Sequence, residues 1–174
     1  MVIAAPTDRW LALPALWRQN RLRMASLAQK ITAPDVQTKV IDDCVQLIDT
    51  EVAGKRGLSG AAVKTGYKVI KALKPTIIRD ACSSLVPDFA AALQPMYEEC
   101  GAADGGDDAG DKFAKHLSAN PDRAADLMLS VTDERAGRAK NKTIKKTYDR
   151  MRGSAKNHVV EAVPNLARTL SKYC

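Results

Sequence analysis

The sequence predicts an all-α protein, a bundle of about six to eight short helices of which several are broken by proline, with no sheet. Only 5% of the 174 residues are aromatic, so Ala, Leu, Val and Ile must build the core. That composition favours helices over strands. Apolar residues also recur at intervals of three and four, the spacing of one helix face. No segment shows the sustained alternation of apolar and polar residues that is typical of a strand.

The first helix of the main domain is expected to begin near Thr32 and to end at Gly54 and Gly57. Threonine is a good N-cap, and Pro34 fits the first helical turn. Asp35 suits the positive end of the helix dipole. The apolar stripe of this helix consists of Val36, Val40, Ile41, Cys44, Val45, Ile48 and Val52.

Prolines divide the next forty residues. A helix should open at Ser59, and a further segment should start at Pro75. Pro87 restarts the apolar pattern, which then continues to about Cys100, and Pro95 within that run predicts a kink.

The remaining elements follow a segment rich in glycine and aspartate, residues 101–110, which predicts a flexible loop. Asp111 is expected to cap a short helix, and Asn120-Pro121 is a start signal for another. The last third of the chain carries a long apolar stripe, which Gly153 and Pro164 are expected to divide into two or three helices.

Residues 1–31 differ from the helical domain expected at 32–174. They hold five basic residues and one acidic residue, and they form a basic N-terminal extension or helix. An Arg-rich, amphipathic segment at residues 8–23 is compatible with an organelle presequence or a helix that lies on a membrane surface. The alternative is that Met24 is the true start and that residues 1–23 are not translated.

The net charge of +7 is concentrated near the C-terminus. Residues 135–156 hold nine basic residues and one acidic residue. Such a density can neutralise several phosphates, which favours binding to nucleic acid, another anionic polymer or an anionic membrane surface. The alternative is a solvated face that pairs with the acidic stretch at 104–134. The candidate binding residues are Arg135, Arg138, Lys140, Lys142, Lys145, Lys146, Arg150, Arg152 and Lys156.

No catalytic or metal-binding motif is present. His116 and His158 lie in no motif that supplies a nucleophile or a ligand partner, so we lean against an enzyme. Gly60 and Gly66 do not match a phosphate-binding loop, and we expect them to allow close helix packing. The acidic loop lacks the spacing of a calcium-binding loop, so neither metal nor cofactor is expected. Its carboxylates are Asp104, Asp107, Asp108 and Asp111.

The four cysteines show no Cys-x-x-Cys spacing and are expected to be reduced, in a cytoplasmic setting. No stretch of about 18 apolar residues is present, so no membrane-spanning helix is expected.

Three blocks of the chain resemble a family of small bacterial proteins of unknown function that is common in actinobacteria. The resemblance extends over about residues 24–173. It implies a compact helical fold and a start near Met24, and it implies no activity and no functional residues. The blocks are LIDTEVAGKRGLSGAAVKTGYKVIKALKP (47–75), LVPDFAAALQPMYEE (85–99) and VTDERAGRAKNKTIKKTYDRMR (131–152).

The hypothesis that the sequence favours is a non-enzymatic helical binding or scaffold protein of the bacterial cytoplasm. Two alternatives stay open. One is a non-specific nucleic-acid-binding protein that acts through residues 135–156, and the other is a peripheral membrane-surface protein that acts through residues 8–23. The partner is a protein or an anionic polymer on these interpretations, and the oligomeric state is open.

Overall fold

The computed structural model describes residues 26–174. Within these residues there are seven α-helices, one 3-10 turn and no strand, which confirms the predicted all-α bundle. The predictions for residues 1–23 and for the start at Met24 lie outside the described residues. The elements are α2 (Leu27–Ile31), α3 (Gln37–Gly54), α4 (Gly57–Leu73), α5 (Ile77–Glu99), η1 (Ala102–Asp104), α6 (Ala109–Ala119), α7 (Pro121–Gly137) and α8 (Lys142–Ser171).

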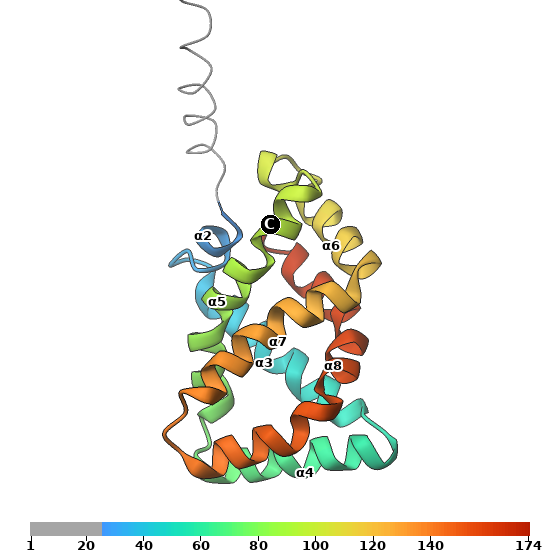
Figure 1. The fold of residues 1–174 in the computed structure, drawn as a ribbon. Helices are drawn as coiled ribbons and strands as arrows, with labels where there is room; N and C mark the ends of the chain where they lie inside the picture. Colours follow the sequence, from blue (N-terminus) through green and yellow to red (C-terminus); the bar gives the residue numbers. More distant parts are fainter. Residues whose placement is uncertain (1–25) are drawn as a thin grey trace, which may run out of the picture.

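The longest helix, α8, organises the bundle. It packs against α3, α4, α6 and α7, and α5 packs against α2, α3 and α7. Figure 1 shows α4 lying across one end of the molecule, beside the first half of α8, whereas α2 and α6 lie toward the other end. One hydrophobic core runs through the bundle and includes residues from Leu27 to Leu170. Its largest fully buried side chains are Tyr97 and Phe113, which form an edge-to-face pair with ring centroids 5.1 Å apart.

Three prolines lie inside continuous helices, so the helix boundaries expected at Pro87 and Pro164 are absent. Pro87 and Pro95 lie within α5, and Pro164 lies within α8. A proline inside a helix removes one hydrogen bond and costs about 3 kcal/mol. Burial on either side offsets this cost, because Val163 and Ala167 next to Pro164 are fully buried. Gly153 does not divide α8 either.

Several helix starts differ from the prediction by a few residues. The start of α3 is Gln37, and Thr32 instead ends α2, where its hydroxyl donates to the carbonyl oxygen of Ala28 at 2.6 Å. The short α2 was not predicted separately, and Ser26 caps it. Helix α4 begins at Gly57, two residues before the expected Ser59.

The start signal Asn120-Pro121 is confirmed, since Pro121 occupies the first turn of α7. The start of α6 is Ala109 rather than Asp111. Residues 101–108 form η1 and a turn, in which Ala102 and Ala103 are buried in the common core, and Ala109 and Gly110 begin α6. This segment therefore joins α5 to α6 around one hydrophobic core.

Three glycines allow close contacts within the bundle. A Cβ atom on Gly60 would lie 2.8 Å from the backbone of Lys55, and one on Gly66 would lie 2.3 Å from Sδ of Met151 in α8. The close helix packing expected at Gly66 is thus confirmed, whereas the close neighbour of Gly60 is Lys55, in the connection just before α4. At the other end of α8, a Cβ on Gly110 would lie 2.3 Å from the carbonyl oxygen of Ser171.

The contact at Gly110 predicts a large cost for adding a methyl group there. Gly110→Ala should destabilise the protein by about 3 kcal/mol, because a backbone carbonyl cannot move aside as a side chain can. Gly153→Ala makes the same chemical change inside α8, where a Cβ meets nothing within 4 Å. It should stabilise the protein by about 1 kcal/mol, since alanine is the better helix former. Urea-induced unfolding followed by circular dichroism measures both effects, and similar values for the two variants would contradict this account of the packing.

Candidate functional site

An apolar cavity of about 350 Å³, partly open to the surface, lies between α3, α4, α5, α7 and α8. We call it the central cavity. Side chains from all five helices form its wall. They include Cys44, Ile48 and Val52 of α3, Val63 of α4, Ala81, Leu85 and Phe89 of α5, Met128 and Leu129 of α7, and Val159, Ala162 and Leu166 of α8.

The wall is built from the apolar stripes that helical spacing creates. On α8, Val159, Ala162 and Leu166 are three and four residues apart, so they lie on one face of the helix. The sequence identifies such residues as core. The apolar stripes do not fill the space between the five helices. Small side chains such as Ala81 and Ala162 line the cavity at positions where larger side chains would fill it.

The cavity surface is almost wholly apolar, and a polar cluster centred on Lys55 lies directly behind one part of it. The Lys55 side chain is 9% exposed, and its Nζ donates to Glu161 Oε2 at 2.6 Å and to the carbonyl oxygen of His158 at 3.3 Å. Glu51 Oε2 lies 3.6 Å from the same ammonium group. The hydrogen bond from Lys55 lowers the pKa of Glu161 below its usual value. Two carboxylates thus face one ammonium group, which gives the cluster a net charge of −1 when the imidazole is neutral.

His158 is the unsatisfied member of this cluster. Both of its ring nitrogens are buried without a hydrogen-bond partner, and its side chain lines the central cavity. The nearest carboxylate oxygen, Oε2 of Glu161, is 3.7 Å from Nδ1. Because buried polar atoms nearly always find partners, an unsatisfied imidazole on a cavity wall is a feature that a ligand group can complete. In the sequence, nothing near His158 reveals this, since Lys55 lies more than one hundred residues away.

Two buried thiols belong to the apolar part of the wall. Burial raises the pKa of Cys44 to about 12, and it also raises the pKa of Cys82. Both side chains are therefore protonated near neutral pH and behave as small apolar groups. All four cysteines are free.

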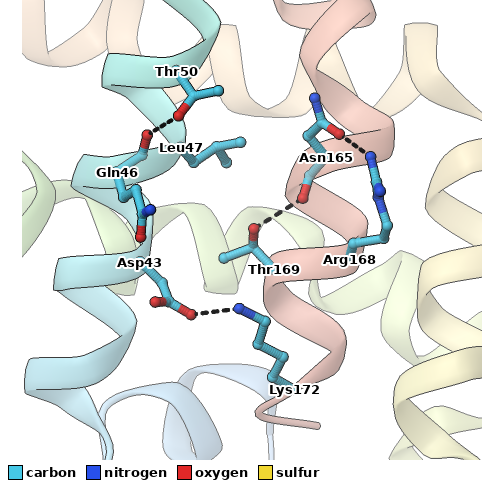
Figure 2. Close-up of a pocket in the computed structure, with 8 residues that line it drawn as sticks. All are labelled: Asp43, Gln46, Leu47, Thr50, Asn165, Arg168, Thr169 and Lys172. Carbon is cyan, nitrogen blue, oxygen red and sulfur yellow. Dashed lines mark hydrogen bonds and ion pairs between the residues drawn. The ribbon is translucent and has the colours of Figure 1, made fainter.

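A polar groove of about 340 Å³ lies on the other side of Leu47, between α3 and the end of α8 (Figure 2). Leu47 lines both the groove and the central cavity. Across the groove, Lys172 Nζ pairs with Asp43 Oδ2 at 2.9 Å. Asn165 of the groove also donates a hydrogen bond to Glu51 of the cavity wall. The groove and the cavity are thus neighbours that share one apolar side chain and one hydrogen bond.

The nine basic candidates of residues 135–156 divide into two groups. Four of them form ion pairs: Arg135 with Asp88, Arg138 with Glu134, Arg152 with Asp133, and Lys156 with Asp126. The other five are exposed, and none has a carboxylate within 4 Å among the described residues. These five are Lys140, Lys142, Lys145, Lys146 and Arg150. The structure therefore brings part of the basic segment against the acidic stretch and leaves the rest facing solvent.

The ion pair between α7 and α8 is part of a small polar cluster. Arg152 Nε and Nη2 donate to the two carboxylate oxygens of Asp133 at 2.6 and 2.8 Å, and Tyr148 also donates to Asp133. Thr132, which lines the central cavity, lies within 3.1 Å of the Tyr148 hydroxyl. The hydrogen bonds from Arg152 and Tyr148 lower the pKa of Asp133 below its usual value of 3.8.

This lowered pKa predicts a pH-dependent contribution to stability. A carboxylate whose pKa is lowered by folding stabilises the folded state above about pH 4, and the contribution disappears as the pH falls through the folded-state pKa. Asp133→Asn should therefore destabilise the protein by less than about 1 kcal/mol at pH 7, because the pair is partly exposed. At pH 3 the difference from the unsubstituted protein should be smaller. Urea unfolding at both pH values measures it, and Asp149→Asn, at an exposed carboxylate without an ion pair, is the control. A difference that is as large at pH 3 as at pH 7 would contradict the assignment.

His116 lies apart from the central cavity, with Nε2 3.4 Å from Glu99 Oε2. The described residues bring no three His, Cys, Asp or Glu side chains together in a group that would hold a metal ion. Within residues 26–174, no helix combines the length and the apolar character needed to cross a bilayer.

Comparison with known proteins gives one match. The sequence model of one protein family, described as Family of unknown function (DUF6918), matches residues 27–174. No curated protein and no solved structure matches the chain.

Proposed function

The chain belongs to DUF6918, a family of unknown function, and we propose that it binds a small apolar molecule that carries one uncharged polar group. The binding site in this proposal is the central cavity. The observation that carries this proposal is a cavity of about 350 Å³ with an apolar wall and a single polar cluster. Ligand pockets are typically about 300–1,000 Å³, with apolar walls and a few polar groups that fix the orientation of the ligand.

The volume indicates the size of the apolar group that the cavity accepts. At about 30 Å³ for each water-sized group, the cavity has room for about a dozen non-hydrogen atoms. A medium-length alkyl chain or a bicyclic ring is of this size. The cavity therefore has room for an apolar group of this size.

The charges near Lys55 determine which polar group fits. The ammonium group is already paired with Glu161 and lies 3.6 Å from Glu51. An anionic group would meet two carboxylates, and burying a charge without its own counter-ion is costly. The imidazole of His158 offers one donor and one acceptor when it is neutral. We therefore expect the polar group of the ligand beside His158 to be an uncharged hydroxyl or carbonyl, because burying such a group there costs less free energy than burying a charged one.

The polar groove of Figure 2 supplies a route for the ligand. Leu47 separates the groove from the cavity, and a leucine side chain changes rotamer more readily than a backbone segment moves. In this proposal the apolar molecule enters past Leu47, with Asn165 and Glu51 at the side of the entrance.

The test of the proposed function is to fill the cavity. The unsubstituted protein should bind 1-decanol, and Ala81→Leu should weaken that binding by about tenfold or more, because the added side chain occupies the cavity. Ala91→Leu, at an exposed position of the same helix α5, is the matched control and should bind as the unsubstituted protein does. Isothermal titration calorimetry measures the affinities. The melting temperature of Ala81→Leu should not fall, since filling a cavity tends to stabilise a protein. Absence of 1-decanol binding, or equal binding by both variants, would overturn the proposal.

The polar end of the cavity gives a separate prediction. The protein should bind 1-decanol more tightly than decanoate at pH 7. His158→Leu should weaken the binding of 1-decanol by about tenfold, the value of one hydrogen bond, and should leave the binding of naphthalene unchanged. Naphthalene is the control ligand because it has no hydroxyl group. Tighter binding of decanoate would show that Lys55 and not His158 receives the ligand.

Binding to nucleic acid through residues 135–156 remains the second candidate. The exposed cations without a carboxylate partner support it, since each is available to a phosphate. The triple variant K142E/K145E/K146E tests it: binding of duplex DNA should be lost, and unchanged DNA binding would eliminate this candidate. We also infer a cytoplasmic location in a bacterium, and the four free thiols support this.

A further inference from the structure

The outer face of α4 carries exposed apolar side chains. Residues 26–174 contain three exposed large apolar residues, and all three lie on α4: Leu58, which is 94% exposed, Val69 at 40% and Leu73 at 43%. Single exposed apolar residues are ordinary on protein surfaces, but a group of them on one element indicates a contact surface.

Helical spacing places these side chains on one stripe, together with exposed small residues. The stripe lies opposite the inner face of α4, where Gly60, Val63 and Gly66 are buried against the bundle. Positions three, four and seven residues apart share one face of a helix. We call this stripe the outer face of α4, and it consists of Leu58, Ala62, Thr65, Val69, Ala72 and Leu73.

Basic side chains flank the outer face on one side. Lys64 and Lys68 of α4 have no carboxylate within 4 Å among the described residues, and Lys71 lies 3.6 Å from Asp49. On the other side, α8 packs on α4 through Met151, which lies against Gly66. The apolar stripe therefore lies beside a row of lysines on α4.

We propose that the outer face of α4 docks on an anionic membrane surface. A helix with an apolar stripe and flanking lysines lies in the plane of the interface, with its apolar side chains among the acyl chains and its ammonium groups at the lipid phosphates. Each basic residue near an anionic bilayer adds to the attraction.

Charge complementarity selects this occupant over two others. A second copy of the chain would bring the same lysines together, and like charges across an interface are unfavourable. Nucleic acid would pair with the lysines, but it offers no apolar environment for Leu58, Val69 and Leu73. A bilayer with anionic headgroups satisfies both the charged and the apolar parts of the surface.

Docking would also place the central cavity close to the bilayer, because Val63 on the inner face of α4 lines that cavity. An apolar ligand is concentrated in membranes, so the two proposals are compatible. The docking proposal does not rest on the cavity, however. Ala81→Leu should not alter vesicle binding, so failure of one proposal leaves the other standing.

The experiment is flotation of the full-length protein with vesicles of phosphatidylcholine, with and without phosphatidylglycerol. Binding should require phosphatidylglycerol and should weaken as salt is added. The double variant K64E/K68E and the triple variant L58A/V69A/L73A should each weaken binding by about tenfold or more. Alanine is a strong helix former, so the triple variant keeps α4 folded.

The matched control is K39E/K115E, which changes the net charge by the same amount. Lys39 of α3 and Lys115 of α6 are exposed, have no ion-pair partner among the described residues, and lie on other helices. This control should bind vesicles as the unsubstituted protein does, and circular dichroism should show equal helix content in all variants.

Several results would overturn the docking proposal. One is no binding to vesicles that contain phosphatidylglycerol, and another is binding that both α4 variants retain in full, which would place the contact elsewhere in the chain. Binding of duplex DNA that K64E/K68E abolishes, without vesicle binding, would assign the surface to nucleic acid. A dimer in light scattering that L58A/V69A/L73A dissociates, without vesicle binding, would assign it to a second copy of the chain.

Discussion

The packing of α8 at its two ends is the constraint on which the rest of the structure depends. Near its start, Met151 lies against Gly66 of α4, and at its end the backbone of Ser171 lies against Gly110 of α6. The contact at Gly110 needs glycine, because a Cβ atom would overlap a backbone carbonyl, whereas at Gly66 the Met151 side chain could move aside. Helix α8 is thereby held close to α4 and α6 at points about twenty residues apart. Between them, its stripe of Val159, Ala162 and Leu166 faces the central cavity. The cavity thus lies along the stretch between two fixed ends, where small side chains do not fill the space.

Ion pairs join α7 to α8. They also decide which cations of residues 135–156 are neutralised and which stay without a carboxylate partner. Arg152 and Lys156 of α8 pair with Asp133 and Asp126 of α7. Carboxylates on one helix and cations on the other, each spaced by one or two turns, align the two helices along their length. The cations used in this way are neutralised. Those nearer the start of α8 have no carboxylate within 4 Å among the described residues and remain available to an anionic partner.

The sequence predicts the local structure well and the tertiary features poorly, for identifiable reasons. The apolar stripes of α3, α5 and α8 are visible in the spacing of residues, because side-chain position on a helix follows from the backbone geometry. Pro164 shows where local rules fail: the predicted break is overridden by the burial of Val163 and Ala167. The polar cluster at the cavity joins Lys55 to His158 and Glu161 from two distant helices, and no local pattern contains that information. Gly66 indicates a close helix contact in the sequence. The partner in that contact, Met151, can be identified only from the fold.

Helix α4 differs from its neighbours in how little apolar surface it buries. Its buried residues are Gly60, Val63 and Gly66, and two of these have no side chain. Since the hydrophobic contribution to stability scales with the apolar area buried, α4 is held to the bundle by less of it than α5, which buries Leu93, Met96 and other large side chains. The glycines give α4 a flat inner face and close contact, whereas Leu58, Val69 and Leu73 are exposed. A helix whose only role was to pack against the core would bury its leucine side chains. The arrangement is the one expected of an element whose outer contacts, and not its inner ones, make use of its apolar side chains.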